Sequence, residues 1–369
     1  MKAVDFFCGA GGLTKGLRLA GINVLVGIDQ EERCRETYNF NNKPSKFVCS
    51  DIKKVNIDEL TTQAEELCTE PNELLFAGCA PCQPFSPQRK SKEYRSDTTI
   101  LGEFGRLIEL FLPGQILMEN VPGISRVKGF STFKRFLKLL DRNGYSIAWD
   151  ILNAKDYGIP QNRNRLVLIA MRGISATLPE KTHGPGLLKY ITVKDAIAKF
   201  PRIKAGKCDA NIPNHEAALL SEINLERLRH TPRNGGSRNS WPEKLILTCH
   251  KKGYNGHTDV YGRMSWNKPA PTLTGKCNSI SNGRYGHPSQ NRAITLREAA
   301  ALQTFPDDYV FFGQKGNIAQ QIGNAVPVVL GKILGDHIVK LRANSKTQKH
   351  SAVQQSEAAT EQAATTELY

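Results

Sequence analysis

Residues 1–30, MKAVDFFCGAGGLTKGLRLAGINVLVGIDQ, decide the fold of this chain. The apolar run 3–7 predicts a buried strand, and a glycine-rich turn follows it. Apolar side chains then recur at helical spacing over 13–20, and the run 22–28 predicts a second buried strand that ends at Asp29. A strand, a helix and a strand in this order form a βαβ unit, which requires a parallel sheet covered by helices.

The same alternation continues to about residue 171, so the sequence predicts an α/β fold with a mostly parallel, Rossmann-like sheet. Further strands are expected at 47–51, 74–77, 115–118, 146–152 and 165–171, and helices at 58–68, 99–111 and 130–140.

Beyond residue 172 the periodicity weakens and Gly, Pro, Asn and Ser become frequent, which predicts a second, smaller domain. A helix at 295–303, with the capping box Thr295-x-x-Glu298, is expected to return to the first domain, as is a long helix within 323–340 that starts near Pro327. The tail is rich in Ala, Thr, Gln, Ser and Glu, and we expect it to be disordered. The predicted division is therefore 1–172, 173–292, 293–342 and a tail of 343–369.

The charge of the chain points to a polyanionic partner. Its 369 residues carry 50 Lys and Arg against 35 Asp and Glu, a formal net charge of +15. Between residues 172 and 294 there are 20 basic and 8 acidic side chains, so this region holds +12 of the surplus. Nucleic acid is the commonest partner for such a surface, and the alternative is a basic protein without one.

The remaining composition indicates a reducing compartment, and we expect a cytoplasmic protein without membrane contact. The nine cysteines suggest free thiols, the first residues carry no signal peptide, and no apolar run approaches the ~18 residues of a membrane span. The Cys and His residues beyond 172 fit no zinc spacing, so we expect no metal.

The glycine turn predicts a nucleotide-like ligand. Glycines between a strand and a helix let a ligand approach the backbone, and the helix N-terminus offers free N–H groups. The pattern G-x-G-x-x-G is not met, because Thr14 stands where its last glycine belongs. Asp29 and Asp51 end the next two strands, and Phe7 offers a ring face, which together favour an adenosyl group over a phosphate.

Three further stretches carry candidate chemistry. Cys82 lies in GCAPCQPFS (78–86), where a strand gives way to a proline-stiffened loop that suits a nucleophile, although a lone cysteine is often structural. Glu119 ends an apolar strand, where it points into the ligand crevice of an α/β sheet unless it only forms a cap or salt bridge. Arg163 and Arg165 alternate at the start of a strand and should share a face, unless they form a solvated edge.

In this order, these stretches resemble the motifs of the DNA (cytosine-5)-methyltransferase family. The resemblance covers about 1–171 and 293–340 and leaves the variable target-recognition region of the family between them. The matching motifs are the glycine turn at 5–12, Pro81-Cys82-Gln83, Glu119-Asn120-Val121, QNRNR (161–165), REAA (297–300) with LQTFP (302–306), and GNAVP (323–327).

The resemblance implies an S-adenosylmethionine-dependent enzyme and assigns residue roles. Cys82 would add to carbon 6 of cytosine, Glu119 would contact ring nitrogen 3 and the exocyclic amine, Arg165 would hold the carbonyl oxygen, and Arg163 would steady the active-site loop and the thiolate. The implied cofactor pocket consists of Phe7, Gly9, Gly11, Asp29, Asp51, Ile52 and Asn324.

The implied substrate is double-stranded DNA with the target base flipped out of the helix. Candidate DNA contacts are Arg89, Lys90, Arg233, Arg238, Arg263 and Thr272, with 231–238 as a flexible base-reading loop. We expect a monomer of prokaryotic type that acts beside a cognate restriction endonuclease, although a solitary or phage-borne enzyme is also compatible. Two rival hypotheses remain: an RNA methyltransferase of the same fold, and a DNA-binding protein without activity.

Overall fold

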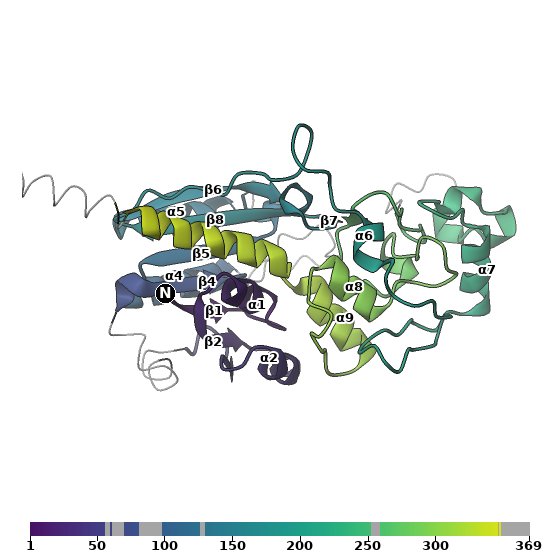
Figure 1. Cartoon of the computed structure of the whole chain (residues 1–369), viewed down its shortest axis with the longest axis horizontal. Coiled ribbons are helices and arrows are strands. Elements are labelled where there is room, and N and C mark those ends of the chain that lie inside the picture. Colours follow the sequence, from purple (N-terminus) through teal and green to yellow (C-terminus); the bar gives the residue numbers. More distant parts are fainter. Residues whose placement is uncertain are drawn as a thin grey trace, which may run out of the picture.

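A computed structural model describes residues 1–55, 60, 70–80, 98–125, 130–251, 259–345 and 347, with the side chains of 98, 99, 130 and 131 left out. The sheet and its covering helices lie at one end of the molecule, and most of the 173–292 region lies at the other (Figure 1). The parallel strands run toward the 173–292 region, so their carboxyl ends face the junction between the two parts.

A seven-stranded sheet forms the first part, in the order β3-β2-β1-β4-β5-β8-β6. The first five strands in this order are parallel, whereas β8 runs antiparallel to both of its neighbours. The mostly parallel sheet predicted from the sequence is therefore confirmed. The strands are β1 (Lys2–Phe6), β2 (Asn23–Asp29), β3 (Lys46–Cys49), β4 (Leu74–Gly78), β5 (Gln115–Asn120), β6 (Tyr145–Asn153) and β8 (Asn164–Arg172).

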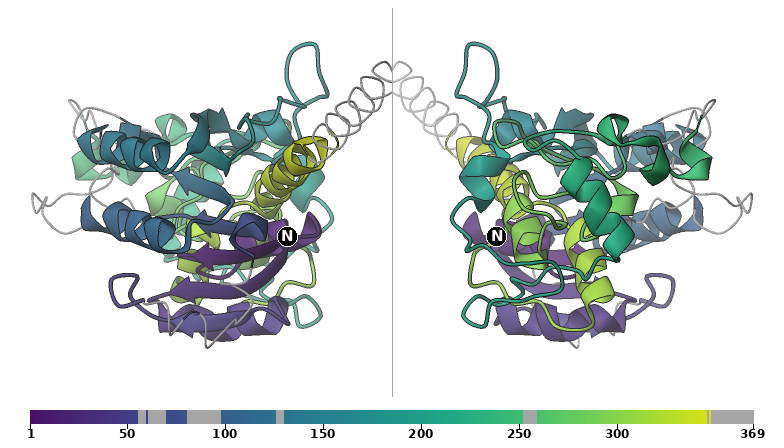
Figure 2. Two further views of the ribbon diagram at one scale, coloured as in Figure 1. Left: turned by 90° about the vertical axis from the view of Figure 1, so that its left-hand side faces the viewer. Right: turned by 90° about the vertical axis from the view of Figure 1, so that its right-hand side faces the viewer.

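Helices cover both faces of this sheet, because alternate strand residues point to opposite sides. On β1, Val4 and Phe6 belong to a core with α4 (Thr98–Phe111) and α5 (Phe130–Arg142). Ala3 points the other way, into a core with α1 (Gly12–Leu19) and a C-terminal helix over 328–345. Figure 2 shows the C-terminal helix on the face opposite α4 and α5. Helix α2 (Arg35–Asn41) packs beside β3.

The second part has little regular structure, as its composition predicted. Its described residues include α6 (Val193–Ile197), α7 (Glu222–His230) and β9 (Ala270–Pro271), and β9 pairs with β7 (Gln161–Asn162) of the first part. Helices α8 (Leu296–Leu302) and α9 (Lys315–Asn324) share a core with α6 and with Met264. The predicted capping box is present, with the Thr295 hydroxyl accepting from the Glu298 backbone N–H and the Glu298 carboxylate accepting from that of Thr295.

The predicted start of the C-terminal helix near Pro327 is confirmed, but Gly323 and Asn324, which were included in the same stretch, belong to α9 instead. Asn324 ends α9, and a new helix starts at 328 and continues to 345. Pro327 explains the break, because the ring of a proline disfavours helical backbone in the residue before it. Helix also extends three residues into the predicted disordered tail, whose remaining residues except 347 lie outside the described part of the chain.

The segment Lys315–Ser345 is long and apolar enough to cross a membrane by length and composition. Such a segment is weak evidence for a membrane span, because the buried core helix of a protein can have the same length and composition. In this segment, 56% of the most apolar window is buried inside the protein. Its apolar side chains enter two cores, Ile318 and Ile322 in one and Leu334 and Ile338 in the other.

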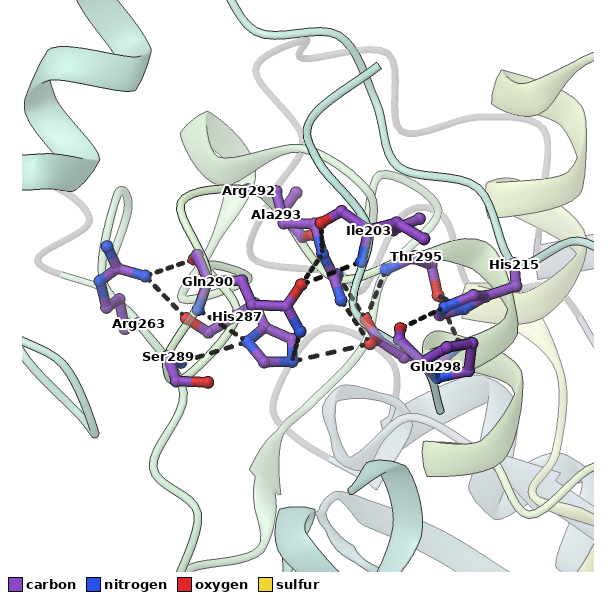
Figure 3. Close-up of polar contacts among 11 residues, drawn as sticks. Ile203, His215, Arg263, His287, Ser289, Gln290, Arg292, Ala293, Thr295 and Glu298 are labelled. Atoms are coloured by element: carbon purple, nitrogen blue, oxygen red, sulfur yellow. Dashed lines mark hydrogen bonds and ion pairs between the residues drawn. The ribbon is translucent and has the colours of Figure 1, made fainter. Parts of the chain in front are cut away.

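A buried polar network connects the second part to α8 (Figure 3). The Arg292 guanidinium donates to both carboxylate oxygens of Glu298, at 2.8 and 2.7 Å, and both side chains are buried. Nδ1 of His287 accepts the backbone N–H groups of Ser289 and Gln290, at 3.1 and 3.0 Å. A nitrogen that accepts two bonds cannot carry a proton, so this geometry requires a neutral His287. Burial lowers the pKa of His287 from 6.5 to about 4, against the opposing charge of Glu298.

We predict that His287 makes the fold sensitive to mild acid. The unfolded chain binds a proton at His287 below about pH 6.5, whereas the folded chain does so only near pH 4. Stability is therefore fully present above pH 6.5 and falls as the pH drops toward 4, by up to about 3 kcal/mol. Urea unfolding of the wild type and of His287→Asn between pH 7 and 4.5 tests this, and the variant should lose less stability over that window.

Exposed His230 lies outside this buried network, so His230→Asn provides the matched histidine substitution for comparison with His287→Asn. The prediction fails if His287→Asn shows the same slope as the wild type.

Candidate active site

The carboxyl ends of β1, β2, β4 and β5 open into a cavity of about 650 Å³ at the junction of the two parts. This volume is in the range of sites that hold a cofactor or a small ligand. Loop residues after these strands form one wall of the cavity, and residues 272–275, α9 and 323–326 form the other.

The glycine turn after β1 is fixed by Asp29. Its carboxylate accepts the backbone N–H of Gly9 at 2.8 Å and that of Glu31 at 2.8 Å. Gly9 has a φ of +50°, which favours glycine, and it lines the cavity with Phe7. Burial raises the pKa of Asp29. Each carboxylate oxygen has a second lone pair, so Asp29 can still accept a bond from a ligand.

Gly11 does not line the cavity, in contrast to the prediction of a cofactor contact. Its φ of +85° caps the start of α1, and a Cβ at this position would lie 2.3 Å from Nδ2 of Asn42. Gly11 is therefore needed for packing beneath the turn.

A smaller cavity of about 50 Å³ adjoins the first one, and both are lined by Phe7 and Asp29. Asp51 and Ile52 line only the smaller cavity. The structure thus brings six of the seven predicted cofactor residues to two adjacent spaces, with an aromatic ring and two carboxylates. Asn324, from the end of α9, lines the large cavity.

Glu119 and Arg165 form an ion pair on the wall of the large cavity. Nε of Arg165 lies 2.9 Å from Oε1 of Glu119, whose side chain is buried at the end of β5. Glu119 thus forms the salt bridge that was its alternative role, and it does so while lining the cavity. The solvated edge suggested for the two arginines does not fit, because Arg163 is buried. Neighbouring Asn120 donates its Nδ2–H to the carbonyl of Ala80 at 3.3 Å, and this bond fixes the chain two residues before Cys82.

Arg163 also lines the cavity, but its guanidinium is tied to the backbone. Nη1 donates to the carbonyls of Leu273 and Gly323 at 3.1 and 3.3 Å, and Nη2 donates to that of Ala325 at 3.2 Å. Burial, with a further contribution from the charge of Arg165, lowers the pKa of Arg163 to about 9. The group is still a cation at neutral pH, and its place is set by three carbonyls.

Cys82 lies in the segment 81–97, outside the described residues, as do the predicted DNA contacts Arg89 and Lys90. Three described cysteines line the cavity, Cys8, Cys34 and Cys79. Burial raises the pKa of each thiol well above its usual range or, for Cys34, to about 12, so none of them is poised as a thiolate. Cys79 was not among the predicted site residues, although it stands three residues before Cys82.

The described residues of the 173–292 region place the predicted DNA contacts in different environments. Arg233 is exposed, whereas Arg238 is half-buried, with its Nη1 3.3 Å from Nε2 of His250. Thr272 lines the cavity and donates its hydroxyl hydrogen to the carbonyl of Asn162 at 2.7 Å. The loop 231–238 is held by several bonds, including Asn234 N–H to the Pro288 carbonyl at 2.8 Å.

Arg263 does not fit the predicted role of a DNA contact. Its side chain is 1% exposed, and its guanidinium makes five hydrogen bonds within the protein. The acceptors are the carbonyls of Leu228, Thr231, His287 and Gln290 and the side-chain oxygen of Asn291. All five N–H groups of an arginine are thus satisfied, and none remains for a phosphate.

Comparison with known proteins identifies the family. The model of the C-5 cytosine-specific DNA methylase family matches residues 1–340. This chain belongs to that family. It is 42% identical over 341 residues to a type II methylase of Herpetosiphon aurantiacus, M.HgiDII, with 91% of this chain and 94% of the relative covered. It is 34% identical to M1.HphI of Haemophilus parahaemolyticus, with 92% and 87% covered.

Solved structures agree on the fold of this methylase. A protein described as a DNA modification methyltransferase encoded within an Escherichia coli prophage matches with a TM-score of 0.72 at 23% identity, covering 93% of this chain and 99% of the other. The Entamoeba histolytica methyltransferase EhMeth matches with a TM-score of 0.61 at 15% identity, covering 92% and 98%. The methylase therefore has the Rossmann-like fold of methyltransferases. Its family and its relatives identify it as a DNA (cytosine-5)-methyltransferase. Within the described residues, no cluster of His, Cys, Asp or Glu could hold a metal.

We predict that Arg263→Ala destabilises the methylase by about 3 kcal/mol or more, because it leaves buried carbonyls without donors. Arg233→Ala, the matched exposed arginine, should change the free energy of unfolding by less than about 0.5 kcal/mol. Urea denaturation measures both values, and fluorescence anisotropy with duplex DNA should show weaker binding only for Arg233→Ala. An Arg263→Ala protein of normal stability with weakened DNA binding would contradict this assignment.

Proposed function

We propose that this methylase transfers a methyl group to carbon 5 of a cytosine flipped out of a specific double-stranded DNA sequence, with Cys82 as the nucleophile. One observation carries the proposal. The candidate catalytic residues Glu119, Arg163 and Arg165 line the same cavity as the candidate cofactor residues Phe7, Asp29 and Asn324. A donor and a target base held in one cavity can approach to reacting distance.

The family implies S-adenosylmethionine as the cofactor, and the residues present fit it. When bound, this group supplies an electrophilic methyl on a sulfonium. Phe7, Asp51 and Ile52 around the smaller cavity would hold the adenine, and Asp29 would accept from a ribose hydroxyl. Asn324 on the opposite wall would bind the methionine end.

The reach of the chain supports Cys82 as the nucleophile. Ala80 lines the cavity, and two extended residues span at most about 7 Å, so the Cα of Cys82 cannot lie farther than that from Ala80. The thiols of Cys8, Cys34 and Cys79 remain protonated at neutral pH, which leaves Cys82 as the candidate thiolate at this cavity. Addition of its sulfur to carbon 6 makes carbon 5 nucleophilic.

Glu119 and Arg165 would recognise and activate the base. The Glu119 carboxyl group would bond ring nitrogen 3 and the exocyclic amine, and Arg165, which orients Glu119, would donate to the carbonyl oxygen. Arg163 would add positive charge beside the thiolate from its fixed place. After methyl transfer, a base takes the carbon 5 proton, and the electrons of that bond restore the ring double bond as the sulfur leaves.

The biological setting follows from the relatives named above, which are type II methylases. We propose that the enzyme acts in the prokaryotic cytoplasm and protects DNA from a cognate restriction endonuclease. One active site that acts on one flipped base needs no symmetry, so we propose a monomer. Bisulfite sequencing of DNA from cells that express the protein would show cytosine methylation in one sequence context, and labelled methyl transfer only to tRNA would refute the DNA substrate.

We predict that Cys82→Ala abolishes covalent trapping on a duplex that contains 5-fluorocytosine, because no sulfur remains to add to carbon 6. Cys79→Ala is the matched control, since it removes a cavity-lining thiol with a raised pKa, and it should still form the adduct. Denaturing gel electrophoresis of protein with labelled DNA measures both. Adduct formation by Cys82→Ala, or its loss in Cys79→Ala alone, would overturn the assignment.

We predict that Glu119→Gln lowers the single-turnover rate of methyl transfer by about 10²- to 10³-fold, in the range of a lost acid–base group. Glu109→Gln removes the carboxylate of an exposed ion pair with Arg142 and should leave the rate unchanged. Rapid-quench assays with labelled cofactor measure the rates. A Glu119→Gln rate within threefold of the wild type would exclude this role.

A further inference from the structure

Two glutamines outside the cavity wall are fully buried beside it. Gln161, in β7, and Gln303, after α8, are both 0% exposed, and neither lines the cavity. Nε2 of Gln161 donates to Oε1 of Gln303 at 2.9 Å. Fully buried amides cost free energy unless their groups are bonded, so their bonds should explain why the fold contains them.

The bonds of these amides close a ring with Arg163. Oε1 of Gln161 accepts the backbone N–H of Leu273 at 3.0 Å, while the carbonyl of Leu273 accepts from Arg163. Nε2 of Gln303 donates to the carbonyls of Ile322 and Ala325, at 2.7 and 3.3 Å. The carbonyl of Ala325 also accepts from Arg163, so the two glutamines and the arginine hold the same pieces of backbone.

Three segments of the cavity wall meet at this ring. They are residues 163–165, 272–275 and 323–326, which come from distant parts of the sequence. The first carries Arg165, the last carries Asn324, and the middle one belongs to the 173–292 region. Each segment is bonded to the ring through its backbone or a side chain. The stretches of chain that connect the three segments are long.

We propose that Gln161 and Gln303 are positioning residues. They hold Arg163, residues 272–275 and Asn324 in fixed positions relative to one another around the cavity. They thereby couple the 173–292 region to the reaction centre. The effect of the two glutamines on methyl transfer rests on the proposed function. Their effect on the position of Asn324 does not, because the affinity of any ligand that binds in the cavity would depend on that position.

Geometry makes the effect on activity larger than the effect on folding. Leucine is close to glutamine in size and can fill either position, but it leaves the N–H of Leu273 or the carbonyls of Ile322 and Ala325 with fewer partners. Those groups then shift toward other partners, and the cavity wall moves with them. A displacement of about 1 Å at a reaction centre can cost 10²-fold in rate.

The experiment compares Gln161→Leu, Gln303→Leu and the double variant in the full-length protein. Gln115→Leu is the matched control, because Gln115 is also a buried glutamine that donates to a backbone carbonyl, that of Asn72 at 3.1 Å, at the far end of β5. Each protein is measured by thermal unfolding, by calorimetric titration with S-adenosylmethionine alone, and by single-turnover methyl transfer to duplex DNA.

We expect Gln303→Leu to weaken cofactor binding about 10-fold and Gln161→Leu to slow methyl transfer 10- to 100-fold, while Gln115→Leu changes neither by more than twofold. The double variant should lose no more than the worse single variant, because either change opens the same ring. If Gln303→Leu does not fold, Gln303→Asn, which is one methylene shorter, carries the same comparison.

Two outcomes would overturn the inference. One is that both ring variants match Gln115→Leu in cofactor binding and methyl transfer, and the other is that the losses of the single variants multiply in the double variant. A wild-type protein that binds S-adenosylmethionine but methylates no DNA would instead refute the proposed function. The titrations would then still test whether the ring positions Asn324.

Discussion

The burial of one guanidinium group constrains the whole junction between the two parts of this methylase. Arg163 is 2% exposed, and a buried cation is tolerated only where its N–H groups find acceptors. It finds them in the carbonyls of Leu273, Gly323 and Ala325, which belong to two segments far apart in the sequence. The 173–292 region and the end of α9 must therefore approach the start of β8 before this arginine can be accommodated.

Close backbone approach at the junction explains the glycines and the proline of the C-terminal motif. A Cβ at Gly323 would lie 2.0 Å from the Thr274 carbonyl oxygen, and one at Gly12 would lie 2.5 Å from that of Val326. Both contacts are far shorter than any side chain permits. Pro327 then ends the extended stretch that begins at Ala325, so Asn324 and its neighbours remain at the cavity wall while the next helix returns to the sheet.

The sequence revealed the sheet because each strand carries a local signal. Runs such as 24–28 and 166–171 have no polar side chain, which is typical of strands covered on both faces, and they are bounded by Asp29 and by Arg165. Pro327 marked the start of the C-terminal helix correctly. Helix α9 was missed, because Ile318 and Ile322 are its only large apolar side chains, and its last two residues were assigned to the next helix.

For a related reason, the sequence predicted some residues of the site but not the contacts between them. Strand ends place Asp29 and Glu119 at the cavity through local geometry, so their positions followed from the order of elements. The ion pair of Glu119 with Arg165 and the polar ring around Gln161 join residues far apart in the sequence. No periodicity encodes such contacts, and the cavity wall formed by 272–275 was equally hidden.

The same limit applies to charge. A sequence gives the number of charged side chains, but it does not show which of them are exposed and which are buried. The region 172–294 carries a surplus of +12, yet Arg263 and Arg292 within it are fully buried. One is surrounded by carbonyls and the other is paired with Glu298, so neither can release a counterion from DNA. The binding of this methylase to DNA should therefore depend on salt less steeply than its charge count suggests, because only exposed cations such as Arg233 can neutralise phosphates.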